Sequence, residues 1–122
     1  MCISNAKPMK ARWVIGYKEV WKKGGAYFGL YSRVRIVDGR APEKKSGEIK
    51  RCAYNLALVG RWSAYKNKPC HFISRGAPPN SPLGRTVMIK VRLSGGLISG
   101  DGLEGREILA GRNITILGEV KQ

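Results

Sequence analysis

The clearest structural signal in the chain is the stretch TVMIKVRL at residues 86–93. Every second side chain from Val87 to Leu93 is apolar, whereas the positions between them include Lys90 and Arg92. Successive side chains of an extended strand point to opposite faces, so this alternation separates an apolar face from a polar one. The period of two therefore predicts a β-strand over residues 86–93.

Other segments indicate further strands on both sides of this one. Trp13, Ile15 and Tyr17 are spaced by two within residues 12–22, and aromatic and β-branched residues fill AYFGLYSRVRI at residues 26–36. Gly24-Gly25 supplies a turn between these two strands, and Asp38-Gly39 is a dipeptide typical of β-hairpins. A short strand over 70–74 and a final strand over 113–120 complete the pattern, which is typical of an antiparallel sheet.

One segment has a different period. Apolar residues recur at helical spacing over residues 49–59, and Ser46 is available as an N-cap. We therefore expect one short helix at about 47–59. Residues 40–48, the Pro-rich segment 75–85 and the Gly-rich segment 95–105 are expected to be loops. The predicted fold class is α+β, with a predominantly antiparallel β-sheet and this single helix.

Length and composition favour one folded domain with an anionic partner. The chain has 122 residues, of which 43% are hydrophobic, and this is sufficient for a single core over 1–122. Its formal net charge of +15 attracts phosphate, whether in a polynucleotide, a lipid head group or a small nucleotide. No apolar run approaches the roughly 18 residues of a membrane span, and no apolar segment near the N-terminus resembles a signal peptide. We expect a cytoplasmic protein that does not bind membranes and keeps its three cysteines reduced.

The residues that usually carry catalysis are scarce. One histidine, three cysteines and eight carboxylates argue against a zinc finger or a His-based metal site. Gly100 to Gly105 matches G-x-G-x-x-G, but too few residues follow it to form the helix of a dinucleotide fold. Cys70 and His71 would point to opposite faces of the predicted strand, so they cannot act as a nucleophile and its base. We expect a binding protein without catalytic residues, metal or cofactor.

Aromatic rings and arginines supply the chemistry of a nucleotide site. Planar guanidinium groups match phosphate oxygens, and aromatic rings stack on bases. The Pro-rich segment 75–85 closely follows the aromatic residue Phe72, which suggests a loop that covers a bound ligand. The rings available for stacking include Phe72 and Trp62, and the guanidinium groups available for phosphate neutralisation include those of Arg33, Arg35, Arg75 and Arg112.

Several short motifs occur in the order of a known family. The chain begins Met1-Cys2, continues with IGYK at 15–18 and PCHF at 69–72, and closes with ILAGRNITIL at 108–117. In this order and in total length the sequence resembles the first family of Thoeris anti-defence proteins. The resemblance implies a phage sponge that sequesters cyclic ADP-ribose isomers without cleaving them, acts in the host cytoplasm and assembles as a homodimer or homohexamer. Some members also hold cyclic oligonucleotides.

The resemblance also implies roles for individual residues. Phe72 would be the stacking platform and Arg112 the phosphate clamp, with Asn113 and Arg106 as further ligand-binding candidates. The chain departs from the family in its Pro-rich segment 75–85, where an acidic or neutral helical stretch is usual, and in its high positive charge.

Two functions therefore compete at this point, and an enzyme that hydrolyses or transfers a nucleotide and a ribosomal or virion structural protein are further alternatives. The first is sequestration of an anionic cyclic nucleotide immune signal, and the alternative is a basic nucleic-acid-binding phage protein or an inhibitor of an RNA-guided nuclease. The alternative explains the charge of +15 more directly. A polynucleotide binder loses affinity steeply as salt is added, whereas a pocket for two phosphates has a shallow dependence, so a salt titration separates the two.

Overall fold

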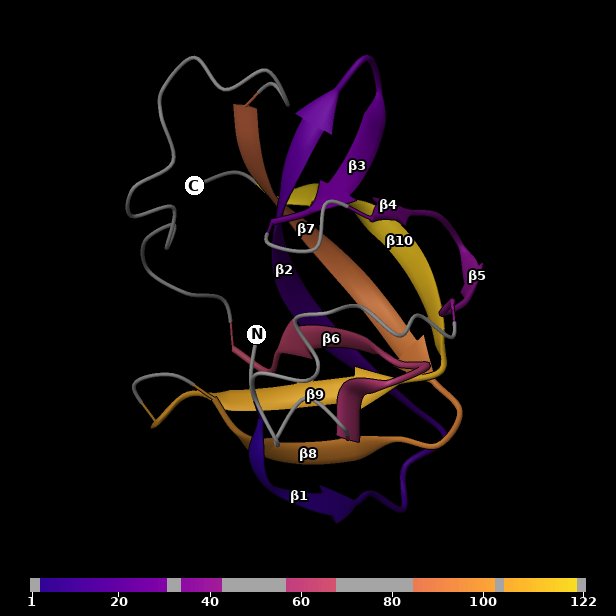
Figure 1. Ribbon diagram of the computed structural model, residues 1–122, viewed down its shortest axis with the longest axis vertical. Helices are drawn as coiled ribbons and strands as arrows, with labels where there is room; N and C mark the ends of the chain where they lie inside the picture. The colour runs from indigo at the N-terminus through magenta and orange to yellow at the C-terminus, as the bar shows by residue number, and fades with distance from the viewer. Residues whose placement is uncertain (1–2, 31–33, 43–56, 68–84, 103–104, 121–122) are drawn as a thin grey trace.

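The computed structural model describes residues 3–30, 34–42, 57–67, 85–102 and 105–120. These residues form ten strands in one sheet, and every paired strand is antiparallel, which confirms the predicted sheet type (Figure 1). In chain order the strands are β1 Ser4–Pro8, β2 Trp13–Lys23, β3 Ala26–Gly29, β4 Arg35–Ile36, β5 Gly39–Arg40, β6 Trp62–Tyr65, β7 Arg85–Ser94, β8 Ile98–Asp101, β9 Glu107–Gly111 and β10 Asn113–Val120.

The long strands β2 and β7 form the centre of the sheet. The strand order is β1-β8-β9-β6-β2-β7-β10-β5, with β3 and then β4 added at one end of β2. Residues 13–22 of β2 pair with residues 85–94 of β7 along their whole length. The other edge of β2 is divided, because Tyr17 pairs with Tyr65 of β6 whereas residues 20–23 pair with β3. Figure 1 shows β3 and β4 at the upper end of β2, and β6, β9, β8 and β1 below.

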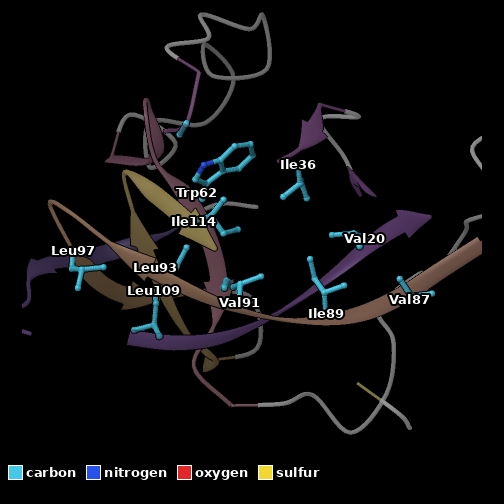
Figure 2. Packing of buried hydrophobic residues seen from close by; sticks show 12 residues of the cluster. Val20, Ile36, Trp62, Val87, Ile89, Val91, Leu93, Leu97, Leu109 and Ile114 are labelled. Atoms are coloured by element: carbon cyan, nitrogen blue, oxygen red, sulfur yellow. The ribbon is translucent and has the colours of Figure 1, made fainter. Parts of the chain in front are cut away.

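The main core lies on one face of β7. Val87, Ile89, Val91 and Leu93 are all buried, as their alternation predicts. Figure 2 shows these side chains on one side of β7, in the region of Ile36 and Trp62. The remaining buried members come from β2, β4, β6, β9, β10 and the connections: Val20, Ile36, Ala41, Trp62, Ala64, Leu97, Leu109 and Ile114. Burial of these side chains from distant segments holds the two parts of the sheet together.

A second, smaller cluster covers the opposite face of β6, β9 and β8. It contains Ile3, Tyr65, Ile98, Ile108 and Ala110, and Ala57 and Leu58 pack against it. Ala64 lies in the main core while its neighbour Tyr65 lies in this cluster, as expected for successive residues of a strand. Strand β6 is therefore buried on both faces, which fixes its position beside β2.

A glycine allows β2 and β6 to approach closely. A Cβ atom on Gly16 would lie 2.8 Å from the Cβ of Ala64 and 3.0 Å from the carbonyl oxygen of Tyr65. Any side chain at position 16 would therefore collide with β6. The glycine at this position permits the close contact between the two strands.

Three strand predictions are confirmed, whereas one strand, one turn and one loop prediction need correction. Segments 12–22, 86–93 and 113–120 form β2, β7 and β10, and Gly24-Gly25 makes the predicted turn. The segment 26–36 is not one strand, because β3 ends at Gly29 and β4 spans only Arg35–Ile36, with 31–33 outside the described residues.

Asp38-Gly39 does not form a hairpin. Gly39 instead begins β5, which pairs with β10, and Asp38 accepts a hydrogen bond at Oδ1 from the backbone N–H of Ile116 over 2.8 Å. The Gly-rich segment 95–105 is not entirely a loop either, since it contains β8. A Cβ atom on Gly100 would lie 2.6 Å from Cγ1 of Ile3, so this glycine reflects close packing against β1.

The expected helix at about 47–59 falls mostly outside the described residues and remains a prediction there. Its end is described and forms a short 3₁₀ turn at residues 57–58. The described parts of the chain contain no α-helix, and thus none long and apolar enough to cross a membrane. The predicted strand at 70–74, with Cys70 and His71, lies outside the described residues, as does the predicted loop at 75–85 up to residue 84.

Candidate functional site

A row of polar and aromatic side chains crosses four strands of the sheet. Trp13 of β2 pairs with Ser94 of β7, Ser94 pairs with Asn113 of β10, and Asn113 pairs with Arg40 of β5. Directly paired residues point to the same face of a sheet. The next row, through Leu93 and Ile114, lies in the main core, so the row that begins at Trp13 faces away from it. Trp13 is 55% exposed, and Asn113 and Arg40 are exposed.

Two more rows continue this surface along β2 and β7. Ile15 pairs with Arg92, and Tyr17 pairs with Lys90. Both basic residues are exposed, while Ile15 and Tyr17 are partly buried. We call this surface the outer face and define it by Trp13, Ile15, Tyr17, Arg40, Lys90, Arg92, Ser94, Asn113 and Thr115, the last of which pairs with Arg92. It carries three cations and no carboxylate.

The outer face ends where the same side of the sheet becomes buried. Glu19 and Met88 form the next pair along β2 and β7, and both are buried. The outer face therefore occupies the end of the sheet that holds Trp13, Ser94 and Asn113.

A turn with arginines on both sides adjoins this end. Gly95 and Gly96 follow Ser94, and the side chain of Arg61 donates a hydrogen bond from Nε to the carbonyl oxygen of Gly96 over 2.9 Å. The side chain of Arg112 lies against Gly96 as well, with Nε 3.0 Å from the point that a Cβ atom of Gly96 would occupy. The Asn113 amide nitrogen lies 2.9 Å from the corresponding point of Gly95. In Figure 1 the β7–β8 and β9–β10 connections lie together at the right, near β5.

The structure brings two of the predicted site residues together and separates two others. Arg112 and Asn113 meet at the Gly95-Gly96 turn. Arg106 lies away from this turn, with its guanidinium carbon 5.9 Å from the centre of the ring of Tyr65, which pairs with Tyr17 at the edge of the outer face. Arg35 is exposed on β4, in the row of Phe28 and Trp21, and Trp21 is eight residues along β2 from Trp13, a separation of about 26 Å.

The predicted aromatic residues do not contribute a described exposed ring. Trp62 is 7% exposed, packs in the main core and donates its indole N–H to the carbonyl oxygen of Gly39 over 3.1 Å. The remaining predicted site residues, Arg33, Phe72 and Arg75, lie outside the described residues.

Sequence reasoning did not single out Trp13, Arg40, Arg61, Lys90 or Arg92 as site residues. The alternation in 86–93 already placed Lys90 and Arg92 on the face opposite the core. What the sequence lacks is the register that sets Arg92 beside Ile15 and Lys90 beside Tyr17. Because Arg40 and Arg61 belong to distant segments, only the folded chain places them near Asn113 and Gly96.

A second polar cluster lies on the core side of the sheet, at its other end. Glu119 accepts hydrogen bonds from Lys22 and, over 3.0 Å, from the hydroxyl of Tyr27. The bond from Lys22, with that from Tyr27, holds the pKa of Glu119 below its usual value. Partial burial, followed by the bond to Glu119, raises the pKa of Tyr27. The carboxylate is engaged by these partners, so this cluster is a structural contact between β2, β3 and β10.

The described residues include no group of three His, Cys, Asp or Glu side chains that could hold a metal ion. Comparisons with protein-family models, curated proteins and solved structures found no match to this chain.

Proposed function

We propose that the protein binds single-stranded nucleic acid across its outer face. The observation that carries the proposal is the register between β2 and β7, which sets Trp13, Ile15 and Tyr17 beside Ser94, Arg92 and Lys90 on the face opposite the main core. An exposed aromatic ring on a flat sheet is a platform on which an unpaired base stacks. Neighbouring cations neutralise the phosphates that connect such bases.

The exposed tryptophan favours a single strand over a duplex. Bases within a duplex are stacked on one another, so an aromatic ring on a sheet reaches them only when they are unpaired. Trp13 is 55% exposed, so its ring is accessible to an unpaired base. The net charge of +15 would raise the rate at which the strand is captured.

The proposal predicts a defined salt dependence. Lys90, Arg92 and Arg40 on the outer face, with Arg112 at the adjoining turn, give about four phosphate contacts. For a single strand this number corresponds to a slope of about −3 in a plot of log affinity against log salt concentration. Affinity for a labelled oligonucleotide, measured by fluorescence anisotropy, should therefore fall about 50-fold between 50 and 200 mM salt.

A pair of charge-matched variants locates the interface. In the first variant, Lys90→Gln and Arg92→Gln remove two cations from the outer face. In the control, Lys7→Gln and Arg35→Gln remove one lysine and one arginine that are exposed on β1 and β4. Both variants lose two charges, but only the first should reduce the salt slope, by about 1.4. Equal loss of affinity in both variants would show that net charge, not the outer face, attracts the strand.

Sequestration of a cyclic nucleotide signal is the second candidate, in line with the family resemblance. It is favoured by the meeting of Arg112 and Asn113 at the Gly95-Gly96 turn, together with Arg61. In this proposal the protein is a cytoplasmic homodimer or homohexamer and does not cleave its ligand. Thermal stabilisation by cyclic ADP-ribose isomers or cyclic di- and trinucleotides, with recovery of intact ligand and no binding of oligonucleotides, would favour it over the first candidate.

A further inference from the structure

Two guanidinium groups converge on the Gly95-Gly96 turn at the end of the outer face. Arg61 reaches the turn from the segment before β6, and Arg112 reaches it from the β9–β10 connection. Within the described part of the chain, neither arginine forms a salt bridge with a carboxylate. Two cations held against one turn repel each other, and a bound anion would remove this unfavourable interaction.

The side chain of Arg61 is fixed before any ligand arrives. Its Nε donates to the carbonyl oxygen of Gly96 over 2.9 Å and its Nη1 donates to the carbonyl oxygen of Ala57 over 3.1 Å. The turn itself is held by a hydrogen bond from the backbone N–H of Arg112 to the carbonyl oxygen of Gly95, over 2.8 Å. A guanidinium group that is already ordered loses little conformational entropy when it binds.

The glycine at position 96 allows Arg112 to lie close to the backbone of the turn. Its φ of +53° is a backbone conformation that favours glycine, and a Cβ atom there would lie 3.0 Å from Nε and 3.4 Å from Cζ of Arg112. With no side chain at position 96, the guanidinium group of Arg112 rests on the same residue that Arg61 contacts. The two positive charges are thereby brought to one corner of the molecule.

The charge of this pair fits a phosphomonoester better than an internal phosphodiester. An internal phosphodiester has a single negative charge, whereas a phosphomonoester has a charge between about −1.5 and −2 at pH 7. The pair lies at the margin of the outer face, next to Ser94 and Asn113, where a strand that crosses this face would end. We propose that Arg61 and Arg112 form a binding site for the terminal phosphate of a single-stranded nucleic acid.

This inference rests on the proposed function, so the experiment must separate the two. Oligonucleotides of one sequence with a 5′-phosphate, a 3′-phosphate or hydroxyl groups at both ends are compared by fluorescence anisotropy. We expect one of the phosphorylated forms to bind about tenfold more tightly than the form with two hydroxyl ends, because a terminal phosphate adds charge-assisted hydrogen bonds. Which end is preferred shows the direction in which the strand crosses the outer face.

Arg112→Gln should abolish this preference while the control Arg35→Gln retains it. Both arginines are exposed, and no hydrogen bond of either side chain contributes to the described fold, so both variants should fold. Arg112→Lys, which keeps the charge but lacks the planar fork, should retain only part of the preference. Equal affinity for all three oligonucleotides in the unmodified protein would overturn the inference and leave the proposed function standing.

Inorganic phosphate provides an independent measurement. Saturable thermal stabilisation by phosphate, relative to chloride at the same ionic strength, should be present in the protein and absent in Arg112→Gln. If phosphate stabilises in this way but no oligonucleotide binds, the anion site is supported and the proposed function fails. Stabilisation that is equal for phosphate and chloride overturns the site.

Discussion

Lys18 on β2 donates a hydrogen bond from Nζ to the carbonyl oxygen of Ser63 on β6, over 2.9 Å. The same nitrogen lies 3.4 Å from the Ser63 hydroxyl oxygen. Tyr17 and Tyr65 are the backbone pair that joins β2 to β6. The hydrogen bond of Lys18 adds a side-chain contact between the same two strands. Burial of the amine lowers its pKa from 10.5 to about 8.

This pKa predicts that stability rises with pH in the alkaline range. Between about pH 8 and 10.5 the unfolded chain holds the Lys18 proton while the folded chain has released it, so raising the pH favours folding. The contribution of Lys18 over this window is about 3 kcal/mol at most. We expect Lys18→Met to remove the rise, as measured by urea unfolding at pH 7, 8, 9 and 10.

Comparison of the unmodified protein with the Lys18→Met variant separates the effect of Lys18 from that of other groups that titrate at high pH. The pKa of Tyr27 is raised above its ordinary value of 10.0. Above pH 10 the unfolded chain therefore loses the Tyr27 proton before the folded chain does, and this lowers the free energy of unfolding. That effect is common to both proteins and cancels in the difference. Parallel stability curves for the protein and Lys18→Met would show that the amine is not buried in solution.

Gly16→Ala should destabilise the contact between β2 and β6. The new Cβ would lie 2.8 Å from the Cβ of Ala64, closer than two carbon atoms pack, so one strand must shift. Forcing an extra carbon into a packed interior typically costs about 1–3 kcal/mol. The free energy of unfolding, measured with urea, should fall by this amount.

The partner in this contact supplies the control. Ala64→Gly removes the atom that the new Cβ would meet, so Gly16→Ala combined with Ala64→Gly should lose less stability than the sum of the single changes. Rescue should be partial, because the carbonyl oxygen of Tyr65 remains 3.0 Å away. Strictly additive losses would contradict the close approach of the two strands.

The long alternating strands could be predicted because their signal is local. In β7 the apolar positions from Val87 to Leu93 reveal the buried face without any knowledge of a partner strand. The sequence does not predict β8, because the glycines of segment 95–105 are typical of a loop. Gly100 in fact lies where β8 packs against Ile3, a residue almost one hundred positions away, and sequence-local reasoning has no access to that contact.

The candidate site was predictable only in part for the same reason. Arg112 was singled out, but its neighbour at Gly96 is Arg61, which comes from a different strand connection. Trp62 and Trp13 are both tryptophans preceded by arginine, yet one is buried and the other is exposed. Their difference arises from the strand order, which places β6 inside the sheet with both faces covered and leaves the outer face of β2 open near Trp13.

Arg106 should affect stability and have only a small effect on binding of nucleic acid, because it contacts Tyr65, which pairs with Tyr17 at the edge of the outer face. Its guanidinium carbon lies 5.9 Å from the centre of the Tyr65 ring, a contact that contributes about 0.5–1 kcal/mol at a partly exposed position. We expect Arg106→Gln to lower the free energy of unfolding by about this amount and to leave oligonucleotide affinity close to that of Arg35→Gln, which also loses one positive charge. Arg92→Gln should show the reverse pattern. A larger loss of affinity in Arg106→Gln than in Arg92→Gln would place the interface over β6 and Tyr65 and not over Lys90 and Arg92.

Trp13 provides the most direct test of the stacking surface, because its fluorescence can be separated from that of the other two tryptophans. Trp21 and Trp62 are buried, and each donates its indole N–H to a backbone carbonyl oxygen, whereas Trp13 is 55% exposed. Stacking of a base on Trp13 should quench the exposed, red-shifted part of the emission as oligonucleotide is added.

Trp13→Ala should abolish this quenching and weaken binding roughly 5- to 150-fold, the range expected for the loss of one stacked base. Its free energy of unfolding should change by less than about 0.5 kcal/mol, since the ring lies outside both buried clusters. Trp13→Phe should retain much of the affinity while it loses the fluorescence signal. If Trp13→Ala binds oligonucleotide as tightly as the unmodified protein, bases do not stack on the outer face and its cations alone hold the strand.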